Sequence, residues 1–172
     1  MAPEHEAPAG GRQLDIVALN QLAYRYAAAV DACDVEAFQA VFTPNGRLRS
    51  YHPDAEAPFA DLTGHAQLAA VPNTMRGLYR RTAHMMTNHL VEIQGDTATG
   101  EVLCMARHLS ADAADPTSIN VVIRYLDRYA RQEDGWRIAD RRIHFLWSER
   151  HQVVDSGMGR GQAKGTADGD DL

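Results

Sequence analysis

The second half of this chain alternates apolar and polar residues along one predicted strand after another, and this pattern limits the folds that the chain can adopt. Turn-forming residues at 95–96, 112–116 and 133–135 separate the alternating stretches. Consecutive stretches of this length and spacing predict an antiparallel sheet. The predicted strands cover 86–94, 98–110, 119–132 and 136–147.

The first half of the chain predicts helices. Over 15–30, apolar residues recur at three- and four-residue steps, which places them on one face of a helix. A second helix is expected over 35–42, because Asp34 is a suitable N-cap and the turn at 43–46 ends it. Helices followed by antiparallel strands predict an α+β fold. Between the two halves we expect a strand over 47–51, a loop over 52–59 and a helix over 64–80.

Length and composition favour one domain. A chain of 172 residues, 45% of them hydrophobic, is long enough for one sizeable core. The terminal segments 1–12 and 154–172 are poor in large apolar residues and are expected to be disordered tails around a domain over 13–153; the second is rich in glycine and acidic residues.

The charge pattern and cysteine usage exclude several classes of partner. A net charge of -6 without a basic run argues against nucleic acid. The absence of a long apolar stretch argues against a membrane. Two cysteines without metal-ligand spacing fit a reducing compartment, so we expect a cytoplasmic protein.

The order of these elements resembles the SnoaL-like branch of the NTF2-like superfamily. The resemblance covers about residues 13–150, and its most recognisable segments are 24–48, 81–103 and 133–143. It implies an α+β cone in which the N-terminal helices pack in the concave face of a curved, mixed or antiparallel sheet.

Within that branch, the chain is most similar to scytalone dehydratase, bile-acid 7α-dehydratase and hexachlorocyclohexane dehydrochlorinase. These enzymes pair an aspartate at the end of the first helix with a histidine on a central strand, and the histidine takes a proton from carbon. Asp31 and His84 match this pair, and Tyr26 and His108 match further active-site groups. The first-strand tyrosine of two of these enzymes is replaced by Ser50.

The chemistry of the residues agrees with this assignment. A histidine titrates near neutral pH, and a carboxylate on one ring nitrogen fixes its tautomer and stabilises its charged form. In the alternative interpretation, Asp31 only caps the next helix and His84 is a core histidine. His108 is interpreted as a general acid or a group that polarises a carbonyl, or else as a surface residue. Tyr26 either assists the leaving oxygen together with His108 or packs in the core.

The remaining candidates are wall and surface residues. Arg141 or Arg142 is expected to pair with Asp140 on a solvated face. If the strand is regular, His89 has the opposite strand parity to His84, which disfavours a metal site, and no nucleotide, flavin or metal motif is present. The candidate substrate-binding residues are Phe42, Ser50, Tyr51, Met75, Met85, Met105, Ile123, Tyr125, Phe145 and Trp147.

Three functions are compatible with the sequence. The first is a cofactor-independent lyase of the dehydratase kind, acting on a small apolar, carbonyl-containing or cyclic substrate. The second is an isomerase or cyclase of polyketide or steroid-type substrates, and the third is a non-catalytic module that binds a small molecule. Apolar residues on both faces of the third predicted strand favour a homodimer or homotrimer.

Overall fold

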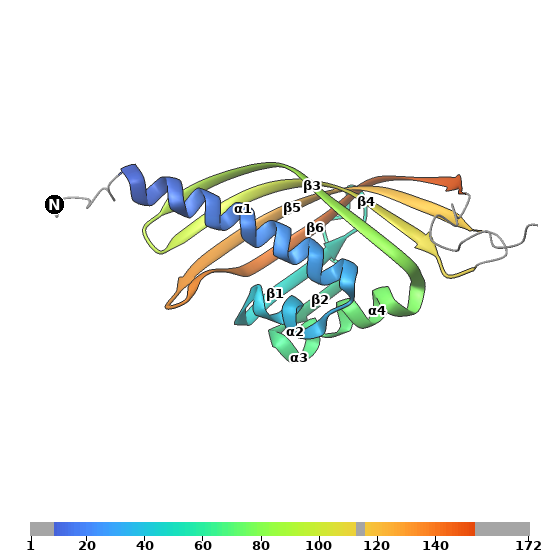
Figure 1. Ribbon diagram of the computed structural model, residues 1–172, viewed down its shortest axis with the longest axis horizontal. Helices are drawn as coiled ribbons and strands as arrows, with labels where there is room; N and C mark the ends of the chain where they lie inside the picture. The colour runs from blue at the N-terminus through green and yellow to red at the C-terminus, as the bar shows by residue number, and fades with distance from the viewer. Residues whose placement is uncertain (1–8, 113–115, 154–172) are drawn as a thin grey trace, which may run out of the picture.

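The computed structural model describes residues 9–112 and 116–153. Within them, a long helix lies along one face of a curved sheet, and short helices gather beside the sheet's first two strands (Figure 1). The helices are α1 (Ala9–Ala32), α2 (Val35–Ala40), α3 (Gly64–Leu68) and α4 (Ala70–Leu78). The strands are β1 (Phe42–Tyr51), β2 (Ala60–Thr63), β3 (Tyr79–Gln94), β4 (Thr97–Ser110), β5 (Thr117–Gln132) and β6 (Gly135–Gln152).

The described strands form one six-stranded sheet in the order β2-β1-β6-β5-β4-β3. β1 pairs with β6 in parallel, and every other neighbouring pair is antiparallel. This confirms the predicted α+β class and mixed sheet. β3 lies at one edge of the sheet, so only one of its sides is paired with another strand.

Several boundaries differ from the prediction. α1 begins at Ala9, inside the segment predicted as a tail, while 1–8, 113–115 and 154–172 lie outside the described residues. The predicted helix over 64–80 is two helices, because Pro72 clashes with the carbonyl of Leu68 in a continuous helix but fits the first turn of α4. β3 begins seven residues earlier than predicted, and β2 was not predicted.

The hydrophobic core lies between α1 and the inner face of the sheet. Tyr26 on α1 packs against Phe38, Phe42 and Tyr125, with ring centroids 5.3–6.2 Å apart. The side chains of Phe38 and Tyr125 are almost completely buried. Each such side chain contributes about 1.5–3 kcal/mol through burial. The helix therefore holds the curve of the sheet from inside.

Two irregularities in β6 change which of its residues face the core. Arg128 pairs with Asp140 and Tyr129 with Ile138, so β6 carries one extra residue there. A second extra residue lies between Phe145, which pairs with Ile123, and Trp147. Because each extra residue reverses the alternation, these bulges decide the face on which later side chains lie.

No helix within 9–112 or 116–153 combines the length and the apolar character that crossing a membrane requires.

Candidate active site

The end of α1 places Asp31 beside the sheet. Cys33 adopts a left-handed conformation with φ of 51°. The Cys33 N–H donates to the Val30 carbonyl at 3.0 Å and the Asp34 N–H to the Ala29 carbonyl at 2.9 Å, which closes the helix. Asp34 caps α2 by accepting from the Ala37 N–H at 3.0 Å. The cap of α2 is therefore Asp34, which leaves the Asp31 carboxylate free for another partner.

That partner is His84 on the edge strand β3. The Asp31 Oδ1 atom lies 2.6 Å from the His84 Nδ1 atom and accepts a hydrogen bond from the Thr82 hydroxyl at 2.7 Å. The other oxygen, Oδ2, accepts the main-chain N–H of His84 at 2.9 Å. An edge strand has main-chain groups that no neighbouring strand pairs, and Asp31 uses one of them. The carboxylate thus holds both the backbone and the ring of His84.

This geometry sets the protonation of the pair. Burial raises the pKa of Asp31, but hydrogen bonds from His84 and Thr82 outweigh burial and hold it below its ordinary value. Asp31 is therefore ionised at neutral pH and accepts the proton of the His84 Nδ1 atom, which leaves Nε2 as the ring nitrogen that can take a further proton. The His84 side chain is 4% exposed and that of Asp31 is 28% exposed, so the pair contacts solvent mainly through the carboxylate.

His108 on β4 lies next to the pair. Its ring centroid is 5.3 Å from that of His84, and its ring stacks on Tyr79 at 4.6 Å. Its Nε2 atom is buried and has no hydrogen-bond partner among the described residues. Burial, and to a smaller extent the charge of His84, lower the pKa of His108 to about 4. His108 is therefore neutral at pH 7 and offers an unpaired nitrogen to a ligand.

Tyr26 lies in the aromatic core, which was one of the two sequence interpretations. The guanidinium carbon of Arg141 lies 4.0 Å from the centre of its ring, and burial raises the pKa of Tyr26 to about 12. A phenol with that pKa is protonated throughout the physiological range and cannot serve as a general base there.

A second charged cluster, which the sequence analysis missed, lies deeper in the core. Arg141 donates to both carboxylate oxygens of Asp127, at 2.8 Å and 2.6 Å, and both side chains are completely buried. The Tyr129 hydroxyl donates to Asp127 at 2.6 Å. The expected pairing of Arg141 or Arg142 with Asp140 on a solvated face is wrong, because Asp140 binds Arg49.

A signal for this cluster is present in the sequence. Asp127 has the same strand parity as Ile123 and Tyr125, so an acidic residue occupies a core position of β5. A buried carboxylate requires a charged or hydrogen-bonding partner. The bulge before Arg141 conceals that partner, because a regular strand would point Arg141 outward.

The structure separates the predicted substrate-binding residues into two groups. Ser50, Ile123 and Phe145 lie on the inner face, Met75 on α4 packs against the core, and Phe42 and Tyr125 are core residues. Tyr51, Met85, Met105 and Trp147 lie on the outer face, opposite to His84.

The assignment of this second group to the substrate site was wrong for identifiable reasons. Met85 directly follows His84 within β3, and adjacent residues of a strand point to opposite faces. Met105 lies between the inward-facing Cys104 and Ala106 in the same way. The bulge before Trp147 turns that side chain outward, where it pairs with Val122.

Among the described residues, no group of three or more His, Cys, Asp or Glu side chains is arranged to hold a metal ion. The polar groups around His84 are histidine nitrogens, one carboxylate and one hydroxyl, and this set suits proton transfer.

Comparisons with known proteins identify relatives of the whole fold. A family model described as a SnoaL-like domain matches residues 12–142. An uncharacterized protein of Mycobacterium tuberculosis is 28% identical over 131 residues, which cover 74% of this chain and 82% of that protein. An NTF2-like protein with a cystatin-like fold from Novosphingobium aromaticivorans is 25% identical, with a TM-score of 0.63, over 80% of this chain and 86% of that one.

Two further solved structures share the fold at lower identity. A suggested scytalone dehydratase of Novosphingobium aromaticivorans has a TM-score of 0.70 and 16% identity, over 86% of this chain and 94% of that one. A hexachlorocyclohexane dehydrochlorinase of Novosphingobium barchaimii has a TM-score of 0.72 and 13% identity, over 86% of this chain and 97% of that one. At these identities the likeness shows the fold alone, and the fold is the expected NTF2-like one.

Proposed function

This chain belongs to the SnoaL-like family, and from that premise we propose that it is a cofactor-independent lyase of the dehydratase kind. The substrate is a small apolar molecule with a carbonyl or an activated ring. One observation carries the proposal: the His84 Nδ1 atom lies 2.6 Å from the Asp31 carboxylate, beside a second histidine whose Nε2 atom is buried and unpaired among the described residues.

In the proposed reaction, the Nε2 atom of His84 takes a proton from the carbon next to the carbonyl. Asp31 stabilises the positive charge that this creates on the imidazole. The electron pair of the broken C–H bond forms the new double bond and expels a hydroxyl group from the neighbouring carbon. The proton on His84 then leaves with that hydroxyl as water, and the neutral base is restored.

His108 serves this reaction as a neutral hydrogen-bond partner. Because its pKa is about 4, too small a fraction of His108 is protonated at pH 7 for it to act as an imidazolium acid. A neutral imidazole N–H donates to a carbonyl or to the departing hydroxyl and polarises it. Of the two roles considered for His108, polarising the substrate is the one that its burial supports.

The surroundings suit an apolar substrate. Met86 follows His84 on the inner face, and Ile119 and Val121 on β5 lie opposite His108 and Ala106 in the sheet. Met86 and Ile119 are only partly buried, so they leave apolar surface for a ligand. Two proteins of the same fold bear the names of elimination enzymes, one for loss of water and one for loss of hydrogen chloride, which supports elimination as the reaction class.

The test is turnover of a panel of β-hydroxy ketones and cyclic β-hydroxy carbonyl compounds, followed by mass spectrometry. Elimination lowers the substrate mass by one water, and His84→Gln lowers the rate at least about 100-fold if His84 is the base. His89→Gln is the matched control, because His89 lies on the same strand but contacts Tyr129. Circular dichroism and urea unfolding check that both variants fold.

The alternative outcomes identify the other functions. A product of unchanged mass, formed with deuterium uptake from heavy water, indicates the isomerase or cyclase. Ligands that bind without product or deuterium exchange indicate the binding module. Equal rates in His84→Gln and the wild type would exclude His84 as the base.

We also propose that an apolar row on the outer face of the sheet joins copies of this chain. Met85, Met105, Val122 and Trp147 are successive partners across β3, β4, β5 and β6, and they form one apolar row. Met105 is 48% and Trp147 56% exposed, which is unusual for large apolar side chains on a lone subunit. Light scattering should give a dimer or trimer mass that Met105→Glu reduces. A monomer in the wild type would contradict the proposal.

A further inference from the structure

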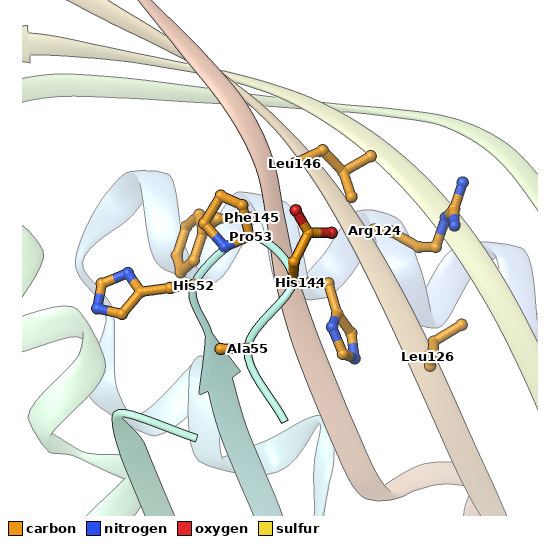
Figure 2. Close-up of a pocket in the computed structure, with 9 residues that line it drawn as sticks. His52, Pro53, Ala55, Arg124, Leu126, His144, Phe145 and Leu146 are labelled. Carbon is orange, nitrogen blue, oxygen red and sulfur yellow. The ribbon is translucent and has the colours of Figure 1, made fainter. Parts of the chain in front are cut away.

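A cavity of about 350 Å³ lies away from the histidine pair, between the turn that follows β1 and strands β5 and β6. In Figure 2, the turn residues His52 and Ala55 lie on one side, Arg124 and Leu126 on the other, and His144 between them. Its volume is within the range of small-molecule sites. The lining residues that carry the argument are Asp54, Arg124, Leu126, His144 and Leu146.

The turn that forms one wall is fixed in place. Asp54 has a left-handed φ of 58°, and the Ala55 N–H donates to the His52 carbonyl at 3.2 Å. The Phe59 N–H donates a hydrogen bond to the Ser50 carbonyl at 2.8 Å, which closes the turn. The His52 ring stacks on that of Phe59, with centroids 4.3 Å apart. The wall is therefore formed before any ligand arrives.

His144 supplies an unused polar group. Its ring stacks on Tyr51, with centroids 4.6 Å apart and planes 7° from parallel, so its orientation is fixed. Its Nε2 atom is buried and has no hydrogen-bond partner among the described residues. A buried polar atom left unpaired costs about 1–3 kcal/mol, and a ligand in the cavity that bonds this atom recovers that energy.

The charges around His144 favour an anion with one charge. Burial and the positive charges of Arg142 and Arg124 lower the pKa of His144, so it is neutral and carries an N–H. Arg124 is half-exposed, and its Nε atom lies 3.0 Å from the carboxylate of Glu101. Asp54 adds a negative charge to the lining, which repels a doubly charged ligand more than a singly charged one.

We propose that this cavity binds a monocarboxylate with a compact apolar body, of about the size of benzoate. The carboxylate accepts hydrogen bonds from the Nε2 atom of His144 and from the guanidinium of Arg124. The apolar body lies against Leu126 and Leu146. The site is separate from His84 and does not depend on the proposed elimination.

Titration with benzoate, followed by NMR of the full chain, tests the proposal. The His144 ring and the methyl groups of Leu126 and Leu146 should shift, and the pKa of His144 should rise, because a bound carboxylate favours the charged imidazole. Arg124→Gln should weaken binding at least about tenfold. Arg128→Gln is the control, since Arg128 is an exposed arginine on the same strand outside the cavity, and it should leave the Kd unchanged.

Other probes give the contradicting outcomes. Benzamidine binding more tightly than benzoate would mean that Asp54 recognises a cation, and inorganic phosphate binding more tightly would mean a dianion site. Either result overturns the proposal. Three other results would also overturn it. The first is a benzoate response confined to His84 and His108, and the second is a Kd in Arg124→Gln equal to that of the wild type. The third is no response at about 10 mM benzoate. Asp54→Asn should tighten benzoate binding severalfold, and a weaker Kd would contradict the assigned repulsion.

Discussion

Two carboxylate pairs lie on the inner side of this sheet, and they differ in what their partners can do. Asp31 with His84 and Asp127 with Arg141 are both joined at 2.6 Å. Both members of the Asp127 pair are completely buried, whereas the Asp31 side chain is 28% exposed. The Asp127 pair holds its charge in an enclosed site, whereas the Asp31 carboxylate keeps contact with solvent.

The chemistry of the basic partner explains the difference. Asp127 holds the pKa of Arg141 above its ordinary value although burial opposes this, so Arg141 keeps its protons. The rings of Tyr125 and Tyr26 lie against its guanidinium, with ring centroids 4.4 Å and 4.0 Å from the guanidinium carbon. His84 instead has one ring nitrogen on Asp31 and the other available. An equally short ion pair is thus structural in one place and suited to proton transfer in the other.

The largest expected effect comes from breaking the Asp127 pair. Arg141→Met leaves the Asp127 charge buried without its partner, so the free energy of unfolding should fall by about 3–5 kcal/mol. Urea unfolding measures the change. Replacing both residues, as Asp127→Leu with Arg141→Met, should recover part of the loss because no buried charge remains. A double variant less stable than Arg141→Met would mean that the pair itself contributes net stability.

The next largest effect is a pH dependence of stability that arises beside the Asp31–His84 pair. His108 has a pKa of about 4 in the folded protein and about 6.5 in the unfolded chain. Between these values the unfolded chain binds more protons, so stability should fall as the pH drops from 6.5 to 4, by up to about 3 kcal/mol. The pKa of Asp31 is lowered in the folded protein, so Asp31 also contributes to stability. That contribution should be lost only when the pH falls below the pKa of the unfolded chain, near 3.8.

Urea unfolding across this pH range measures the loss. His108→Gln should reduce the dependence between pH 6.5 and 4 to the smaller part that His89 and His144 contribute, because burial lowers their pKa values too. His151→Gln, at an exposed position, should leave it unchanged. A His108→Gln variant with the wild-type pH dependence would show that another group titrates there.

The smallest effect concerns the hydrogen bonds that hold the pair of Asp31 and His84. Thr82→Val removes one of the hydrogen bonds to Asp31, at 2.7 Å, and should cost about 1 kcal/mol. The ring and main-chain bonds of His84 remain, so ¹⁵N NMR should still find the proton of neutral His84 on Nδ1. Asp31→Ala should move that proton to Nε2. A change of tautomer in Thr82→Val would mean that the hydroxyl, as well as the carboxylate, fixes the ring.

Sequence periodicity predicted the parts of the fold in which each element is regular. The apolar face of α1 and the alternation of β5 both lie where the pattern placed them. The pairing of Asp31 with His84 came from the family resemblance, because 53 residues separate them and no local pattern connects them.

The errors come from positions where the alternation is broken or a strand begins early. The bulges in β6 sent Trp147 outward and Arg141 inward. The early start of β3 placed Met85 inside a strand rather than before one. A bulge depends on pairing with the neighbouring strand, so the sequence of one strand does not reveal it.

The parallel contact between β1 and β6 has a consequence for synthesis. A ribosome makes the chain from its N-terminus, so β1 and β2 emerge long before β6, the strand that joins them to the rest of the sheet. Until then their open edge has no partner, and contacts of such long sequence separation form slowly. The newborn chain therefore depends on its last strand, and truncation before residue 152 should yield a product that is prone to aggregate rather than a smaller folded domain.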